Sequence, residues 1–211
     1  MRWPARLAWL AIATCAVGLT VSRVGHGQGS GDARLARLDP ATRVAVVALV
    51  DSARRLRLPT EPLVDKALEG EKKGADGGRI VTAVRGLSAE LREARASLGT
   101  GASADEITAG ANALHAGFAM RDLARLRTGA QGAGRARLTL PLTIATDLVA
   151  RGVPIATASD VMLSLVRAGL RDSEFTLFQR NVRLDIERGA DPATAAQTRA
   201  RGAMLHTGRT S

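Results

Sequence analysis

Aromatic residues and cysteine are almost absent from most of this 211-residue chain. It has no tyrosine, and its two tryptophans and its single cysteine, Cys15, all lie close to the start. The remaining aromatic side chains are Phe118, Phe175 and Phe178. A single cysteine excludes an internal disulfide and a multi-thiolate metal site. The core must therefore consist mainly of Leu, Val, Ile and Ala, a composition that suits helices better than aromatic-rich sheets.

The chain also lacks a hydrophobic run long enough for a stable membrane-spanning helix. Its apolar run near the start, Leu7 to Val21, has 15 residues, fewer than the roughly 18–20 that a bilayer requires. Arg2 and Arg6 precede this run, and Gly25 and Gly27 offer small residues at the −3 and −1 positions of a cut before Gln28. This layout is typical of a secretory signal peptide over residues 1–27, with an uncleaved anchor as the alternative. We expect a periplasmic or secreted protein that contacts the membrane only through this leader.

Negative charge is scarce relative to positive charge, and the net charge is +10. Three of the arginines lie in the leader, so the rest of the chain carries about +7. A basic balance favours anionic partners such as a membrane surface, a cell-wall polymer or nucleic acid. No block of five or six like charges occurs, however, so the arginines can equally be spread over helix exteriors. Nucleic acid is not expected, because stacking aromatics are missing and the chain is expected to be exported.

The chain does contain regularly placed residues that favour the starts and ends of helices. Residues suited to cap a helix start recur between apolar segments, and glycines follow several of those segments. One segment carries an apolar stripe at the 4-3 spacing of a single helix face. The expected caps are Asp39, Asp76, Ser103 with Glu106, Asp172 and Asp191, and the stripe is Ile80, Val84, Leu87, Leu91, Ala94 and Leu98. No long segment alternates with period two. These patterns predict an all-α protein.

The regular series of helix-starting and helix-ending residues is interrupted once, by the glycine-rich segment 128–138. We interpret it as a flexible linker between an N-terminal helical unit, residues 28–127, and a C-terminal helical unit, residues 139–211. Each unit is expected to hold about four helices, with the fourth helix ending near Arg127. The two units are expected to pack as a helical bundle or as a short helical array.

One pattern occurs in both units at the same spacing. Pro59, Asp65, Leu68 and Gly74 match Pro154, Asp160, Leu163 and Gly169 without a gap. The match has two explanations. The helices can share the same start and stop residues because helix chemistry favours them. Alternatively, a four-helix unit was duplicated, since regular spacing is the usual sign of a repeat architecture.

No sequence signature of catalysis, of cofactor binding or of metal binding is present. His115 lies beside the apolar face of a predicted helix, where a partly buried histidine with one polar partner is expected, and no second histidine stands at a metal-ligating spacing. There is no Gly-x-Ser-x-Gly elbow, and the glycine-rich "GAQGAG" lacks the Lys-Ser/Thr of a phosphate-binding loop. We therefore expect no catalytic residue, no cofactor and no metal.

The most distinctive local segment is "EGEKKGADGGRI", which runs from Glu69 to Ile80. Gly70 inside a helix costs up to about 1 kcal/mol relative to alanine, which indicates close approach of a neighbouring helix or of a ligand. The spacing of the Glu-Gly, Lys-Gly and Arg-Ile pairs resembles that of uncharacterised exported proteins of GC-rich bacteria. That resemblance implies no activity. The candidate interaction surface is Glu69, Gly70, Lys73, Gly74 and Arg79.

These observations favour a non-enzymatic binding or scaffolding protein of the cell envelope whose partner is another protein or an anionic envelope component. The alternative is an envelope enzyme or a chaperone-like accessory that acts on an anionic polymer. A pocket with clustered ionisable groups would favour the enzyme, and a broad apolar groove between the units would favour binding. The sequence does not predict the oligomeric state.

The leader yields a first testable prediction. Mass spectrometry of the protein purified from an envelope fraction should find a new N-terminus near Gln28, because the small residues up to Gly27 fit a signal-peptidase site. Recovery of the intact chain from Met1 onwards would show that the leader is kept as an anchor.

Overall fold

The computed structural model describes residues 32–134 and 137–207, so the predicted leader lies outside the described residues. All regular secondary structure in these two ranges is helical, which confirms the all-α class. A short 3-10 helix, η1 (Ala33–Arg37), precedes nine α-helices: α1 (Pro40–Arg55), α2 (Glu61–Lys72), α3 (Gly77–Leu98), α4 (Ala104–His115), α5 (Met120–Gly132), α6 (Thr139–Ala150), α7 (Ile155–Arg167), α8 (Asp172–Glu187) and α9 (Pro192–Thr207).

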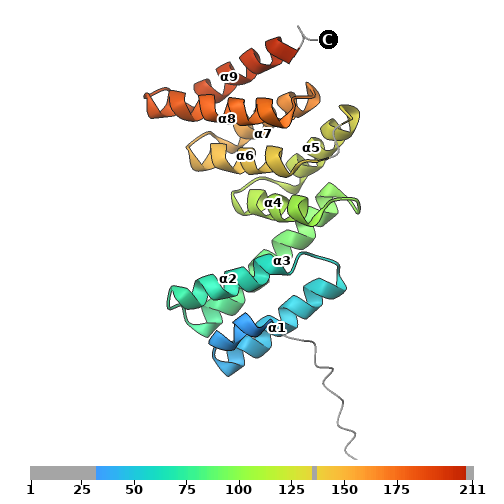
Figure 1. Cartoon of the computed structure of the whole chain (residues 1–211), viewed down its shortest axis with the longest axis vertical. Helices are drawn as coiled ribbons and strands as arrows, with labels where there is room; N and C mark the ends of the chain where they lie inside the picture. The colour runs from blue at the N-terminus through green and yellow to red at the C-terminus, as the bar shows by residue number, and fades with distance from the viewer. Residues whose placement is uncertain (1–31, 135–136, 208–211) are drawn as a thin grey trace, which may run out of the picture.

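The helices form two layers stacked along the long axis of the molecule (Figure 1). Helices that are two apart in the chain pack side by side, except α2 and α4. In one layer α1 packs on α3, α3 on α5, α5 on α7, and α7 on α9. In the other layer α4 packs on α6, and α6 on α8, while α2 packs on α1 and α3. The result is an elongated helical array with α1 and α9 at opposite ends (Figure 1).

Most of the predicted helix starts are confirmed by side-chain hydrogen bonds to the first turn. The Asp76 carboxylate accepts from the Arg79 amide, and the Asp191 carboxylate accepts from the Thr194 amide. Ser103 caps α4. Asp172 was predicted to be a cap but is the first residue of α8, and the cap residue is Arg171. The difference arises because the Glu174 carboxylate accepts from the Arg171 amide, which begins the helix one residue earlier.

The predicted fourth helix is in fact two helices. A turn at Gly117, whose φ is +100°, ends α4, and α5 then begins at Met120. The predicted linker 128–138 is wrong in its first part, because α5 continues to Gly132. Gly129 and Ala130 are buried, and a Cβ on Gly129 would lie 3.0 Å from Leu163 Cδ1. These small residues permit close packing of α5 on α7 and do not indicate flexibility.

The array continues across the boundary predicted between the two units. Helix α4 packs on α6, and α5 packs on α7. Within the described ranges, five α-helices precede residue 133 and four follow it. Two units of four helices each are therefore not confirmed.

The repeated sequence pattern falls on α2 and α7, which lie in different layers. Gly74 and Gly169 end these helices with φ values of +68° and +71°, in the left-handed region that glycine adopts without strain. A duplication in this register would exchange the two layers. The shared preference of helices for the same start and stop residues is therefore sufficient to explain the match.

A buried carboxylate, Glu106, holds α4, α5 and α6 together. It is 2% exposed. One of its oxygens accepts from Arg127 Nη2 of α5 at 2.7 Å and from the Leu138 amide, at the start of α6, at 2.8 Å. The other oxygen accepts from the Ser103 amide at 2.9 Å, which completes the predicted capping box. The same side chain thus starts one helix and fixes two others.

The ionised form of Glu106 is favoured despite its burial. Burial by itself would raise the pKa of this carboxyl group. The hydrogen bonds from the Ser103 and Leu138 amides and from Arg127 outweigh that effect and lower the pKa below its ordinary value of 4.5. The ion pair therefore remains charged at neutral pH.

Replacement of this carboxylate should be among the most damaging single changes in the chain. We expect Glu106→Ala to lower the free energy of unfolding by about 3–5 kcal/mol, because it removes the carboxylate that pairs with the largely buried Arg127 guanidinium and accepts from two backbone amides. Urea denaturation followed by circular dichroism would measure the change. Glu93→Ala, at an exposed position of α3, is the control and should change it by less than about 0.5 kcal/mol.

The same interaction sets a pH dependence whose sign can be derived. Because the folded-state pKa of Glu106 lies below 4.5, its contribution to stability is fully present above about pH 4.5. It is lost as the pH falls through the lowered pKa of the folded state. Glu106→Ala should therefore lose less stability on acidification than the unsubstituted chain does. Parallel pH profiles of the two proteins would contradict this role.

Candidate functional site

An open groove lies between α2 and α4, the one place in their layer where successive helices do not pack extensively on each other within the described chain. Helix α2 packs on the first turns of α3, where a Cβ on Gly70 would lie 2.8 Å from Ile80 Cγ1. Helix α4 packs on the last turns of α3, where a Cβ on Gly110 would lie 3.0 Å from the Ala94 Cβ. The part of α3 between these contacts forms the floor of the groove.

The groove has a main section of about 590 Å³ and an extension of about 430 Å³ towards α6. The two sections share Pro62, Asp65, Thr108 and Asn112 and are therefore continuous. We call the whole hollow the α2–α4 groove. The main section is also lined by Lys66, Glu69, Ala83, Gly86, Leu87, Glu90 and His115, and the extension by Pro59, Glu61, Ala104, Asp105, Ala109, Thr139 and Thr143.

Carboxylates dominate the charge of this groove, although the chain as a whole is basic. Its lining contains five carboxylates, on Glu61, Asp65, Glu69, Glu90 and Asp105, but only one lysine, Lys66. The negative charge of the lining is opposite in sign to the net charge of +10, so the groove is a distinct electrostatic region of the surface.

Cations at the rim neutralise part of this negative charge. Arg34 of η1 donates to Glu61 at 2.6 Å and reaches Asp65 at 3.5 Å. Glu69 accepts from Lys66 at 3.1 Å and from Lys73. Hydrogen bonds from Lys73 and Lys66 lower the pKa of Glu69 to about 2, so this carboxylate is ionised at neutral pH.

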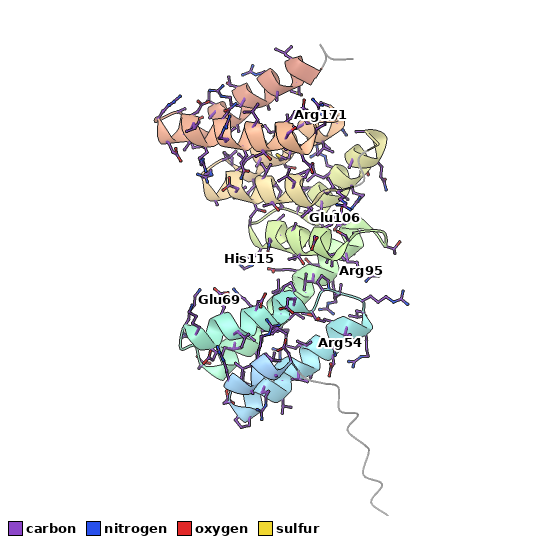
Figure 2. All side chains as sticks on the ribbon, viewed as in Figure 1. Arg54, Glu69, Arg95, Glu106, His115 and Arg171 are labelled. Atoms are coloured by element: carbon purple, nitrogen blue, oxygen red, sulfur yellow. The ribbon has the colours of Figure 1, made fainter. Side chains whose placement is uncertain are left out.

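The contact between His115 and Glu90 joins the α4 wall of the groove to its floor on α3. Figure 2 shows Glu69 of α2 and His115 of α4 on the same side of the molecule, across the gap that α3 spans. The His115 Nδ1 atom lies 2.9 Å from Glu90 Oε1. The side chain of His115 is 75% exposed, so the expectation of a partly buried histidine was wrong, although a single polar partner is present. Its helix ends at this residue, which places the ring outside the core.

Two residues in the groove are unfavourable in helices and are not explained by internal packing. Gly86 lies in the middle of α3, and a Cβ built on it meets no atom within 4 Å. Asn112 is an exposed residue of α4 whose carboxamide makes no hydrogen bond to the described residues. Glycine costs about 1 kcal/mol in a helix interior relative to alanine, and asparagine also costs part of that amount. Both residues leave the groove open and polar.

Four of the five residues predicted as an interaction surface are brought together by the structure. Glu69, Gly70, Lys73 and Arg79 line a small hollow of about 200 Å³ that adjoins the α2–α4 groove at Glu69. Gly74 does not line it, because this glycine ends α2. Gly70 is explained by close packing of α2 on α3. A binding role for this hollow stays a prediction.

Sequence reasoning missed most of the groove. Asp65 was identified only as part of a repeated helix pattern, and Glu90, Gly86 and Asn112 were not identified as candidate residues. The available signal was the presence of a glycine and an asparagine in helix interiors away from the apolar stripes. Leu87, the third residue of the apolar stripe of α3, supplies a further signal. It is only half-buried at the groove floor, whereas its five stripe neighbours are buried.

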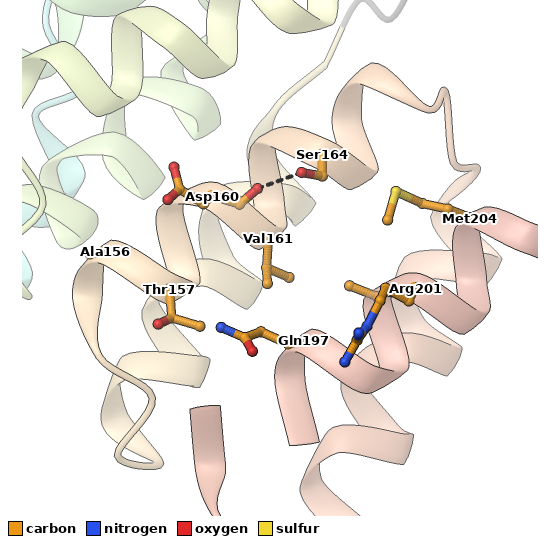
Figure 3. A pocket seen from close by; sticks show the side chains of 9 residues that line it. Ala156, Thr157, Asp160, Val161, Ser164, Gln197, Arg201 and Met204 are labelled. Atoms are coloured by element: carbon orange, nitrogen blue, oxygen red, sulfur yellow. Dashed lines mark hydrogen bonds between the residues drawn. The ribbon is translucent and has the colours of Figure 1, made fainter. Parts of the chain in front are cut away.

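A second hollow of about 430 Å³ lies between α7 and α9 (Figure 3). Asp160 and Arg201 are its only charged lining residues. The Ser164 hydroxyl donates to the Asp160 carbonyl at 2.8 Å, a bond within α7 (Figure 3), and the Asp160 carboxylate contacts Arg125 at 3.3 Å. The polar groups of Ser164 and Asp160 are thus engaged within the fold, and the hollow gathers no cluster of like charges, so we do not regard it as the main site.

The described ranges, 32–134 and 137–207, contain no group of three or more His, Cys, Asp or Glu residues placed to hold a metal ion. None of the helices in these ranges combines the length and the apolar composition of a membrane-spanning helix. The ionisable residues of the α2–α4 groove are exposed or half-buried, and Glu69 is ionised by its lysine partners. They do not form the buried pair of ionisable groups that is typical of general acid–base chemistry.

Comparison of the chain with protein-family models, with curated proteins and with solved structures gave no match.

The two glycines around the groove should respond oppositely to the same substitution. Gly86→Ala should raise the free energy of unfolding by about 0.5–1 kcal/mol, because the new methyl group has open space and alanine favours the helix. Gly70→Ala should lower it, because its Cβ would press on the buried Ile80. Urea denaturation of both variants measures the difference. A loss of stability in Gly86→Ala would show that this glycine has a structural function.

Proposed function

We propose that this protein is a non-catalytic binding module of the cell envelope, and that its α2–α4 groove holds a segment of a partner protein. The observation that carries the proposal is an open, carboxylate-lined groove in a basic chain. Its floor is the exposed middle of α3, which contains Gly86, a glycine that close packing within the fold does not explain. A concave surface with a few placed polar groups is the usual form of a binding site.

The charge of the groove favours a protein partner over an anionic polymer. Five carboxylates would repel a phosphate-rich or uronic acid-rich chain. A polypeptide can offer lysine and arginine side chains to the same carboxylates. The groove therefore does not support the alternative of an enzyme or chaperone-like accessory that acts on an anionic polymer.

Location in the envelope rests on the leader predicted from residues 1–27. A binding module without disulfides relies on its packed core, and the buried residues form one continuous cluster of Leu, Val, Ile, Ala and Phe through the described part of the chain. Such a rigid array is suited to present a groove with little ordering cost on binding.

Site-specific photo-crosslinking tests this function. A benzoylphenylalanine at position 83, an exposed alanine in the groove floor, should form adducts with a polypeptide in cells that produce the full chain. The same residue at Ala124, an exposed alanine of α5 in the other layer, is the matched control. Mass spectrometry identifies what is attached at each position.

The result expected is the same polypeptide partner attached at position 83 and absent at position 124. Equal labelling at both positions, or adducts of position 83 that contain no polypeptide, would contradict the proposed function.

A further inference from the structure

We infer that the segment held in the α2–α4 groove is a cationic polypeptide in extended conformation, whose lysine or arginine side chains meet Asp65, Glu90 and Asp105 and whose main chain pairs with Asn112. This inference rests on the proposed function and names the class of partner segment that the groove accepts. It does not depend on the identity of the partner.

The cationic character follows from the carboxylates that the fold leaves available. Glu69 is already paired with two lysines, and Glu61 is bound by Arg34. Among the described residues, Asp65 has only a 3.5 Å ion-pair contact to Arg34, and Glu90 has the single ion-pair partner His115. Asp105 makes no ion pair with the described residues. These three carboxylates line one continuous groove and can each receive a ligand cation.

The extended conformation follows from the polar groups on α4. The Asn112 carboxamide offers an acceptor and two donors, and it lies where the two sections of the groove meet. An extended segment has free amide N–H and C=O groups that need partners, whereas a helix satisfies its own. The Thr108 hydroxyl, one turn before Asn112, donates to the Ala104 carbonyl and keeps its lone pairs for a ligand N–H.

A helical ligand fits the groove less well. Docking of an amphipathic helix requires a broad apolar groove that receives residues at i, i+3, i+4 and i+7. The floor here consists of Ala83, Gly86 and Leu87, flanked by charged residues of α2 and α3. A side chain of an extended segment can enter the space above Gly86, where a Cβ would meet no atom within 4 Å beyond its chain neighbours and the backbone of its own helix.

Fluorescence anisotropy with defined peptides tests this inference. The probes are labelled peptides of about ten residues, which span up to about 33 Å when extended. One alternates lysine and alanine, one alternates glutamate and alanine, and one alternates lysine and proline, which cannot form a helix. The protein is the chain without its predicted leader, residues 28–211.

The lysine–alanine and lysine–proline peptides should bind with similar affinity, at least about tenfold tighter than the glutamate peptide. Added salt should weaken this binding, because the contacts are exposed ion pairs. Asp65→Asn combined with Glu90→Gln should weaken it about fivefold. Asp51→Asn combined with Glu93→Gln, outside the groove, is the matched control and should leave the affinity unchanged.

The main-chain contact is tested separately. Asn112→Ala should weaken binding of the lysine–alanine peptide about two- to tenfold, the range of one or two lost hydrogen bonds. Asn181→Ala, at an asparagine of α8 outside the groove, should have no effect. Alanine favours a helix more than asparagine does, so a loss of affinity in Asn112→Ala would not come from unfolding. Circular dichroism confirms this for each variant.

The contrary outcomes are distinct from those of the crosslinking test. Binding of lysine–alanine but not of lysine–proline would overturn the extended conformation. Equal binding of the lysine and glutamate peptides, or no loss in Asp65→Asn with Glu90→Gln, would overturn the cationic ligand. If position 83 still captures a polypeptide in those cases, the groove binds proteins of another class. If it captures none, the proposed function fails as well.

Discussion

The buried contact between Glu106 and Arg127 decides how the middle of the array is built. The carboxylate oxygens of Glu106 also accept from the amides of Ser103 and Leu138. A single side chain therefore fixes the start of α4, the position of α5 and the start of α6. A carboxylate taken out of water is stable only when its oxygens are hydrogen-bonded, as both oxygens of Glu106 are. Because α4 carries Asn112 and His115, the same contact also sets the position of one wall of the groove.

The second constraint is the length of α3. With 22 residues it is the longest helix in the described part of the chain, about 33 Å long. Helix α2 packs on its first turns, and α4 packs on its last turns. The two helices of the other layer therefore rest on different parts of α3, and a stretch of its surface between them remains open. The groove is a consequence of helix lengths and contact points, with no irregular backbone required.

The charge of the groove is opposite in sign to the net charge of the chain. The arginines raise the net charge to +10, yet many of them are held in ion pairs on helix exteriors, such as Arg199 with Asp185 and Arg151 with Asp147. The groove gathers carboxylates from α2, α3 and α4 with a single lining lysine. A basic protein can thus present an acidic site, and the overall charge governs non-specific attraction while the local field selects the ligand.

The sequence by itself determined the helical class, most helix starts and the apolar stripe of α3, because caps and 3.6-residue periodicity depend on neighbours within a few turns. It also located Glu69, Gly70, Lys73 and Arg79, which lie together because they flank one interhelical turn. Only the tertiary structure decided that Gly129 and Ala130 are packed and not flexible, that matching segments occupy different layers, and that Asp65, Glu90 and Asn112 face one groove. These residues come from three helices separated by up to 47 positions, and side-chain spacing within one helix carries no information about which helices later become neighbours.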